Sequence, residues 1–527
     1  MKLKRIVAFT AAIAVCASLC ACTDKKTSVK KDIDLSGGYP IDTDVTLTYW
    51  LELTPNVSAT ASNMGDTEFA KGLAERTGVK VEYLHPAVGQ QIEAFNLMVA
   101  SGDLPDIIEH FWLDAMPGAP DAALQNEVII PINDLMKEYA PNLTKYLNEH
   151  PNVDRAVKTD DGTYYTFPFA MDDTKLGITA GIVFRKDWLD ELGLDVPSTV
   201  EEWEEVLVAF RDKKGATAPL TLRSTQPDYL YRTLGSCNEF YLDETGKVNY
   251  GIYDPNFKRA LQTLNKWYKE GLLDKNYTLN DSTILDSNML NGISGATFAS
   301  GGSGVGKWLT AKKGEKFDLV GAELPTIDGK PNKYGLVFNP YNGYNSASIS
   351  TKCAYPELAA KYLDYLYGEE GHMYANFGVE GVSYEMIDGY PTFTELITKN
   401  PEGLSMSQAM AKYSRAGCSG AMIQDVRYIE QYYELPSQKE ALDKWSKQAE
   451  YAKNTTLPLV TLTMDESSEF GSLYSDIKKY CDENIISFIT GSKSFSEWDK
   501  FVKEVENMDI KRCIEIKQAA YTRYMSK

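Results

Sequence analysis

The chain has 527 residues, with 54 lysines and arginines against 74 aspartates and glutamates, and a formal net charge of −20 at pH 7. Phosphate backbones and anionic lipid surfaces repel so acidic a protein, so the composition argues against nucleic-acid binding and against electrostatic binding to membranes. Because the chain is too long for a single hydrophobic core, we expect two lobes.

The N-terminus has the pattern of a lipoprotein signal peptide at residues 1–21. Three basic residues within positions 2–5 precede an apolar run at 6–19 that is too short to span a bilayer comfortably. The run ends in Leu-Cys-Ala-Cys, which resembles the bacterial lipobox and predicts acylation of Cys22. Two acyl chains on one cysteine suffice for stable anchoring. An ordinary cleaved signal peptide that happens to contain cysteines is the alternative.

The segment at 22–44 is polar, contains a Ser-Gly-Gly-Tyr-Pro stretch and predicts a flexible tether. No later segment has the apolar length of a membrane span, so we expect the folded part to lie outside the cell, held to the membrane by the lipid alone. Five widely spaced cysteines follow position 22, and their odd number and spacing indicate no disulfide framework.

Apolar and polar residues alternate as in a strand where the folded part begins. Helical stripes and further short strands follow, with glycine-containing segments at the helix ends. We predict strands at 45–53, 79–83 and 106–110, and helices that include 69–73 and 92–99. Strands and helices that alternate at this spacing predict an α/β lobe with a largely parallel sheet.

A capping box opens the clearest helix of the chain. Thr199 and Glu202 have the required spacing, and an apolar stripe follows at helical periodicity from Trp203 to Phe210. The apolar residues of such a stripe are expected in the core. Further helices are predicted from 354 and from 496.

Several segments together resemble the extracellular solute-binding proteins of carbohydrate ABC transporters, and among these the sugar-binding lipoproteins of Gram-positive bacteria. The segments occur in family order from about residue 45 to the C-terminus. They lie at 96–108, at 184–194 with a Pro-Ser-Thr helix start at 197–199, at 346–350 with 356–366, at 369–371 with 377–384, and at 514–524.

The resemblance implies an α/β fold that is periplasmic-binding-protein-like (type II), with two α/β lobes, a hinge made by chain crossings, and a ligand in the interlobe cleft. It implies an N-terminal lobe of residues 45–163 and 326–375 and a C-terminal lobe of residues 164–325 and 376–527. It further implies a monomer without cofactor or catalytic activity, which stands at the extracellular face of the membrane and hands an oligosaccharide to permease subunits.

Metal and nucleotide sites are not expected. Some relatives have an acidic calcium loop where this chain has 211–219, which contains too few carboxylates for a hard cation. The four histidines show no metal-binding spacing. The glycine-rich segment 301–307 has the spacing of a phosphate-binding loop, but Trp308 stands where Ser or Thr must hold magnesium, so we expect a glycine loop near the cleft.

Loops that combine aromatic and polar side chains suit a sugar, because rings pack on its C–H faces while its hydroxyl groups need hydrogen-bonding partners. Such loops follow the predicted strands or precede 346, and strand ends are where open α/β sheets place ligands. The candidate contacts are Trp50, Glu52, Trp112, Tyr341, Asn342 and Tyr344, with Phe169, Asp172 and Arg185 near a proposed crossing and Trp308 beside the glycine loop. A core or plain surface role is the alternative for each residue.

Two other functions stay open at this point. A carbohydrate-active enzyme retained at the surface would need two carboxyl groups across a cleft, and no sequence pattern identifies such a pair. A solute sensor on the same fold would bind a receptor domain instead of importer subunits. A peptide or another polar solute is an alternative ligand.

Overall fold

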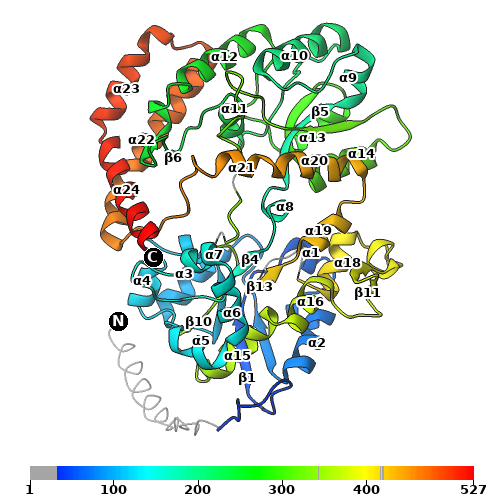
Figure 1. The fold of residues 1–527 in the computed structure, drawn as a ribbon, viewed down its shortest axis with the longest axis vertical. Helices are drawn as coiled ribbons and strands as arrows, with labels where there is room; N and C mark the ends of the chain where they lie inside the picture. Colours follow the sequence, from blue (N-terminus) through cyan, green and yellow to red (C-terminus); the bar gives the residue numbers. More distant parts are fainter. Residues whose placement is uncertain (1–31, 337, 342, 416, 418–419) are drawn as a thin grey trace, which may run out of the picture. The chain divides into compact units, whose positions relative to one another are not determined.

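Helices and small sheets alternate through the computed structural model, which describes residues 32–336, 338–341, 343–415, 417 and 420–527 (Figure 1). The signal peptide, the acylation expected at Cys22 and the contact expected at Asn342 lie outside these residues. Within them, no helix combines the length and the apolar character that crossing a bilayer requires.

The first sheet contains four strands, in the order β10, β3, β1, β2. Their bounds are Ser346–Ile349 for β10, Ile107–His110 for β3, Thr46–Trp50 for β1 and Lys80–Leu84 for β2. Strand β1 is parallel to β2 and β3, whereas β10 is antiparallel to β3. The three N-terminal strands expected from the alternation are therefore confirmed.

A separate two-stranded sheet continues the first sheet beyond β10, through a single bridge. Phe167 and Ala347 form an antiparallel bridge, and β4 (Phe169–Met171) then pairs in parallel with β13 (Met422–Gln424). Because both β3 and the segment leading into β4 are antiparallel to β10, the strands β1, β2, β3, β4 and β13 all point the same way. Their carboxyl ends therefore lie along one edge of the sheet.

Helix α2 (Glu68–Thr77) illustrates how local sequence sets these elements. The Thr67 side chain accepts a hydrogen bond from the backbone N–H of Ala70 and caps the helix. Gly78 ends it in the left-handed conformation, at a φ of 75°, and a Cβ there would lie 2.1 Å from the carbonyl oxygen of Ile41. A side chain at this position would therefore break the turn that leads into β2.

Helices of the first sheet pack their apolar residues on its strands. Phe95 of α3 (Gln91–Ser101) belongs to one core cluster with Trp50 and Ile108. The other elements of this region are α1 (Pro55–Ser58), α4 (Asp121–Gln125), α5 (Asn133–Tyr139), α6 (Pro141–Glu149), α7 (Pro151–Ala156), α15 (Pro356–Asp364), α16 (Glu369–Phe377), the hairpin of β11 (Tyr384–Ile387) and β12 (Tyr390–Phe393), α17 (Glu395–Thr398) and α18 (Met406–Tyr413).

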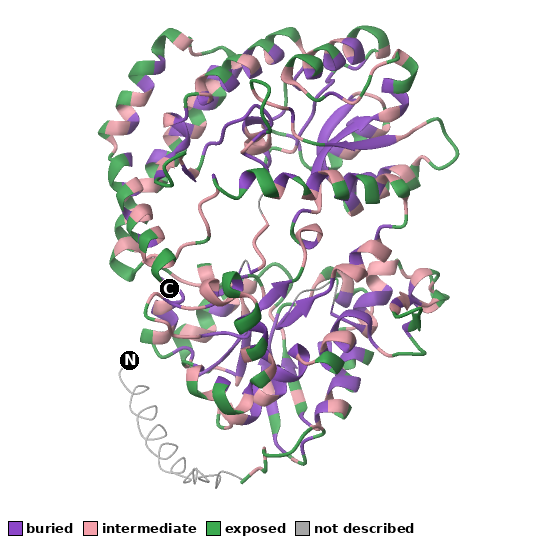
Figure 2. Cartoon of the chain, in the orientation of Figure 1, coloured by how far each residue is buried: buried purple, intermediate pink, exposed green. Residues whose placement is uncertain are grey.

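The second sheet has the order β8 (Ala296–Ser300), β5 (Ala180–Arg185), β9 (Leu319–Ala322), with β5 antiparallel to both neighbours. Its core cluster includes Trp203 of α10 (Val200–Lys214), Trp267 of α12 (Phe257–Glu270) and Phe488 of α22 (Met464–Thr490). The capping box predicted at Thr199 and Glu202 is present at the start of α10. Figure 2 shows how strongly the strands of this sheet are buried.

Three segments connect the elements around the two sheets. The first leaves β4 and passes through α8 (Thr174–Gly177) to β5, the second runs from β9 to β10, and the third leaves β13 through α19 (Val426–Tyr432) to α20 (Pro436–Ser446). Helix α20 packs against β9 and β5. Since β13 pairs with β4 and α18 packs against α1 and α2, part of the chain after 376 joins the first sheet. The lobe limits stay a prediction. These contacts place residues after 376 beside the first sheet, whereas the resemblance assigns them to the C-terminal lobe.

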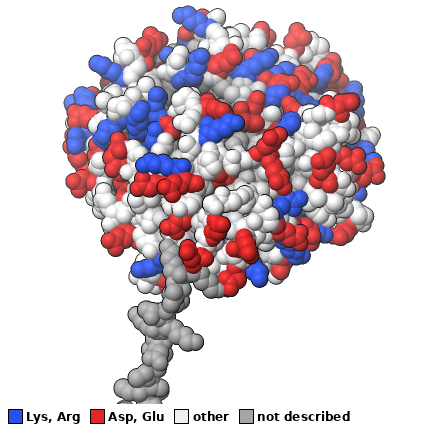
Figure 3. Space-filling view, turned by 60° about the horizontal axis from the view of Figure 1, so that its bottom comes forward, with Lys and Arg blue, Asp and Glu red and all other residues white. Residues whose placement is uncertain are grey.

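The C-terminal helices return to the elements of the first sheet. Helix α23 (Trp498–Asn507) leads into α24 (Ile510–Ser526), and the chain ends beside α4 and α7 in Figure 1. Charged side chains of both signs intermingle on the face drawn in Figure 3, so the acidic excess is not gathered into one patch there.

Candidate functional site

The carboxyl edge of the first sheet brings most of the predicted contact residues together. Ligands bind beside the carboxyl ends of strands in open α/β sheets. Trp50 and Glu52 lie at the end of β1, and Asp172 follows β4, whereas Tyr344 precedes the antiparallel β10. These positions therefore meet at one edge, although they are up to about 300 residues apart in the sequence.

Three of the predicted contact residues are open to solvent at this edge. Glu52 and Asp172 are exposed. Tyr344 is 56% exposed, and its ring stacks on Phe111 with 5.2 Å between the centroids. Trp50, Phe169 and Tyr341 are buried, and the Tyr341 hydroxyl lies 3.1 Å from that of Tyr165.

Both predicted stacking tryptophans lie in the core. Trp112 is fully buried and its indole N–H donates to the carbonyl of Ser346 at 3.0 Å. Trp308, in α14 (Lys307–Ala311), is 1% exposed and donates to Asp286 at 2.7 Å. Protein atoms cover both rings in this structure, which fits the core alternative, while a role in ligand binding stays a prediction.

Arg185 is also occupied by contacts within the protein. Its guanidinium donates to both carboxylate oxygens of Asp187, at 2.8 and 2.6 Å, and lies 4.3 Å from the ring centres of Trp188 and Phe317. The residue is 6% exposed. These contacts stabilise the start of α9 (Lys186–Leu192). A role of Arg185 in ligand binding stays a prediction.

The glycine segment after β8 allows a close approach of one crossing. A Cβ on Gly301 would lie 2.7 Å from the ring of Tyr433. The carbonyl of Gly301 accepts from the Gln438 amide at 2.7 Å, and its N–H donates to Thr179. The helical turn Gly301–Gly306 (η4) is thus bonded both to α20 and to the segment before β5.

Two cavities lie next to each other beside the crossings. One, of about 320 Å³, lies along α11 (Pro227–Thr233), and we call it the α11 cavity. The other, of about 270 Å³, is bordered by α7 and α24, and we call it the α24 cavity. Asn339 and Thr456 line both cavities, so the two are contiguous. A volume of roughly 300 Å³ or more is typical of small-molecule sites.

The lining of the cavities combines rings with hydrogen-bonding groups. The α11 cavity is lined by Asp228, Tyr229, Arg232, Glu239, Tyr241 and Tyr334, among others. The α24 cavity is lined by Asn152, Phe338, Tyr341, Lys453, Tyr521 and Tyr524, among others. Tyr341 connects the second cavity to the first sheet, because it forms a bridge with Ala170 of β4.

Electrostatic interactions hold the polar groups of the α11 cavity. Arg232 donates to the carboxylate of Glu239 and, at 3.5 Å, to the carbonyl of Tyr334. Burial, together with the carboxylate of Glu239, raises the pKa of Asp228 to about 6. The Tyr229 ring lies flat on Phe298 of β8, with 3.5 Å between the centroids.

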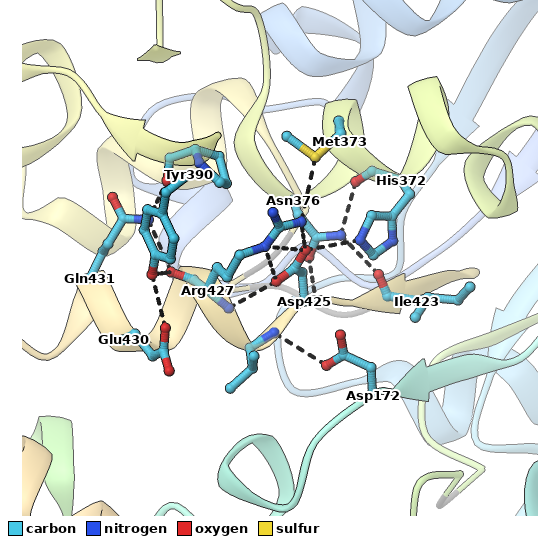
Figure 4. A network of polar contacts seen from close by, with 12 residues as sticks. Asp172, His372, Met373, Asn376, Tyr390, Ile423, Asp425, Arg427, Glu430 and Gln431 are labelled. Carbon is cyan, nitrogen blue, oxygen red and sulfur yellow. Dashed lines mark hydrogen bonds and ion pairs between the residues drawn. The ribbon is translucent and has the colours of Figure 1, made fainter. Parts of the chain in front are cut away.

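A second polar network joins two of the crossings (Figure 4). Asp172 precedes α8 and accepts from the N–H of Val426, the first residue of α19, at 3.2 Å. Asp172 is exposed, but nearby protein atoms partly desolvate its carboxyl group. This desolvation, together with the charge of Asp425, raises the pKa of Asp172 to about 6. Asp172 therefore links the ends of β4 and β13 where the chain leaves the first sheet.

Asp425 is the centre of that network. It lies 3.0 Å from the Nε2 atom of His372 and accepts from Arg427 at 2.9 Å. Although burial opposes this, the hydrogen bonds from His372 and Arg427 hold the pKa of Asp425 well below its usual range. The Asn376 side chain accepts from the N–H of Asp425 and donates to the carbonyl of Ile423, so α16 fixes the end of β13.

No group of three or more His, Cys, Asp or Glu side chains that could hold a metal ion is found in the part of the chain that the structure describes. The segment 211–219 begins in the last turn of α10, and Arg211 there pairs with Asp212 and donates to the carbonyl of Glu270.

Sequence reasoning missed the α11 segment and the residues around Thr456, which lie between α20 and α22. Two signals existed for α11. Proline at the first position marks a helix start, and Asp228 and Arg232 stand four residues apart, which places them on one helix face. The residues 455–457 carry no such signal, because only the path of the chain before α22 brings them to the cavity.

Comparisons with known proteins add to this geometry. A family model described as bacterial extracellular solute-binding protein matches residues 58–373. The fructooligosaccharide ABC transporter substrate-binding protein FusA of Streptococcus pneumoniae is 24% identical over 99% of this chain and 98% of its own. Lipoprotein LipO of Bacillus subtilis is 24% identical over 65% of this chain and 69% of its own.

The fold is also that of a solved protein. The crystal structure of an alginate-binding protein without calcium ion is similar with a TM-score of 0.69 and 24% identity, over 91% of this chain and 98% of that chain. The expected fold class, α/β and periplasmic-binding-protein-like of type II, is therefore confirmed.

Proposed function

The chain belongs to the bacterial extracellular solute-binding protein family, and from this we propose that it captures an oligosaccharide outside the cell and delivers it to the permease subunits of an ABC importer. The name of the Streptococcus relative, a fructooligosaccharide ABC transporter substrate-binding protein, supports this choice of ligand. The proposed site consists of the contiguous α11 and α24 cavities and the carboxyl edge of the first sheet.

One observation carries the proposal most directly. Rings such as Tyr229 and Tyr241 line the same cavity as the carboxyl groups and the guanidinium of Asp228, Glu239 and Arg232. Aromatic faces pack on the C–H faces of a sugar, and charged hydrogen-bonding groups match its hydroxyl groups. The contiguous cavities offer room for more than one sugar residue.

We further propose that the protein binds its ligand without converting it. Asp228 and Glu239 lie close enough together for Glu239 to help raise the pKa of Asp228, whereas the carboxyl groups of a glycosidase stand about 5 to 9.5 Å apart with the sugar between them. Because Arg232 also holds Glu239, we expect this pair to bind a ligand and not to act on its glycosidic bond. Prolonged incubation with oligosaccharides, followed by chromatography, would reveal products if this part of the proposal is wrong.

Two lobes, an anchored N-terminus and a monomeric state complete the proposal. The crossings through α8 and α19 are joined by the hydrogen bond between Asp172 and Val426, and the crossing from β9 to β10 lines both cavities, so these segments are the proposed hinge. The lipobox-like residues before Cys22 support lipid anchoring at the extracellular face, as does the name of the Bacillus relative, a lipoprotein.

A thermal-shift screen over neutral and acidic oligosaccharides tests the proposed ligand class. A ligand that binds only the folded state raises the melting temperature in a concentration-dependent way. We expect such a shift with at least one oligosaccharide, and uptake of that sugar should be lost when the neighbouring permease genes are deleted. Shifts only with peptides would replace the oligosaccharide by another solute.

A further inference from the structure

The charged groups of the α11 cavity are unequal in number. Among the described residues that line it, two carboxyl groups, Asp228 and Glu239, face one guanidinium, Arg232. Lys478 of α22 lies nearby, but it binds Asp482 at 2.7 Å. The cavity therefore has more hydrogen-bond acceptors with negative charge than cations to balance them.

The guanidinium in the cavity is already occupied. Arg232 donates to Glu239 with one nitrogen and to the Tyr334 carbonyl with another. A carboxylate on a ligand would have to compete with Glu239 for Arg232, and it would lie beside Asp228 as a like charge. Like charges in a partly desolvated site repel strongly, because less water is present to screen them.

The same carboxylates favour neutral hydroxyl groups. A sugar hydroxyl can donate to a carboxylate oxygen, and hydrogen bonds to charged acceptors are stronger than those to neutral ones. One face of the Tyr229 ring rests on Phe298, so only its other face can receive the C–H face of a sugar. Acceptors and a ring thus occur together along α11.

We infer that the α11 cavity takes an uncharged sugar residue through Asp228 and Glu239, and that this carboxyl pair discriminates against uronic-acid sugars. The inference rests on the proposed function and narrows its substrate class to neutral oligosaccharides. The raised pKa of Asp228 agrees with the geometry, since burial and the neighbouring carboxyl group of Glu239 both oppose its negative charge.

A matched pair of ligands tests the inference. The neutral oligosaccharide that gives the largest thermal shift is compared by calorimetric titration with the same oligosaccharide after oxidation of its primary alcohols to carboxylates. We expect the oxidised form to bind about tenfold more weakly or worse, which corresponds to a free-energy difference of about 1.4 kcal/mol. Asp228→Asn should reduce the ratio of the two dissociation constants, oxidised over neutral, severalfold, because it keeps the shape of the side chain and removes its charge.

Two further variants provide a second test within the cavity and a control outside it. Glu239→Gln changes an exposed side chain and should narrow the ratio even if Asp228→Asn folds poorly. Asp499→Asn, on an exposed position of α23, removes a charge outside the cavity and should leave the ratio unchanged.

The outcomes separate the inference from the proposed function. Oxidised ligand that binds as well as the neutral one, or a ratio that neither cavity variant changes, overturns the inference and leaves oligosaccharide capture in place. If no oligosaccharide binds, neutral or acidic, the proposed function is wrong and the inference is wrong with it.

Discussion

Arg523 in the last helix binds Asp160, which lies in the turn after α7. The same guanidinium donates to both carboxylate oxygens of Glu466 at the start of α22, at 2.8 and 2.5 Å. Lys527 adds a second contact to Asp160 at 3.2 Å and donates to the carbonyl of Lys158. The C-terminus is thereby tied to a region that packs around the first sheet.

Replacement of Arg523 should destabilise the fold. Arg523→Ala leaves Asp160 and Glu466 without their shared partner, and both side chains are only about one fifth exposed. We expect a loss of about 1.5 to 3 kcal/mol in the free energy of unfolding, the range for hydrogen bonds to charged groups. Chemical denaturation measures this loss.

The same helix provides a matched control. Arg512 makes an equivalent two-oxygen contact with Glu469 of α22, but both side chains are nearly half exposed. Arg512→Ala should therefore cost at most about 1 kcal/mol. Equal losses for the two variants would show that the contact to Asp160 adds nothing.

The two tryptophans should behave as core residues. Trp112→Ala and Trp308→Ala each remove a fully enclosed ring, so we expect each to lose about 3 to 5 kcal/mol of stability with or without ligand. Tyr344→Ala, at an exposed ring, should leave stability nearly unchanged. A loss of ligand affinity without a loss of stability in either tryptophan variant would instead support the stacking role.

Selectivity against acidic sugars should depend on pH. Asp228 is charged above its pKa of about 6 and protonated below it, with Glu239, Arg232 and Lys478 as the neighbouring charges. Discrimination should be full only well above pH 6 and should decrease as the pH falls through that value. Titrations of the neutral and oxidised ligands at several pH values check this, and Asp228→Asn should show a flat profile over the same range.

The same carboxyl group affects folding in a defined direction. Its pKa in the folded protein is higher than the ordinary value of 3.8 for this side chain, so between about pH 4 and 6 the folded state holds more protons than the unfolded state. The contribution of Asp228 to stability therefore decreases as pH rises through this window. The difference in unfolding free energy between wild type and Asp228→Asn, measured across the window, should follow that sign.

Lipidation at Cys22 makes a simple prediction about fractionation. Cys22→Ala should move the protein from the membrane fraction to soluble or unprocessed forms, because no acyl chain can then be attached. Mass spectrometry of the wild-type protein should show an acylated N-terminal cysteine, and a peptide without an acyl group would contradict the anchoring.

Chelation should leave the protein unchanged. The segment 211–219 contains Arg211, Lys213 and Lys214 beside a single aspartate, so a calcium ion would find too few oxygen ligands there. The melting temperature and the affinity for oligosaccharide should be the same with and without a chelator. A loss that added calcium restores would reveal a site elsewhere in the chain.

Local sequence determined the elements of this protein well. The alternation before Trp50, the capping box at Thr199 and Glu202 and the glycine after α2 each act within a few residues, so their outcome could be predicted. Glu52 could also be predicted at the carboxyl end of the first strand, where open α/β sheets bind ligands, whereas Asp172 could be predicted only near a crossing.

Only the tertiary structure decided which of these side chains face solvent. Trp112 is enclosed through a contact with Ser346, which is 234 residues away in the sequence. The α11 cavity likewise combines Asp228, Tyr334 and Thr456, from three separate parts of the chain. Burial and cavity lining depend on such distant contacts, which the pattern of neighbouring residues does not encode, whereas helix caps and strand alternation depend on near neighbours alone.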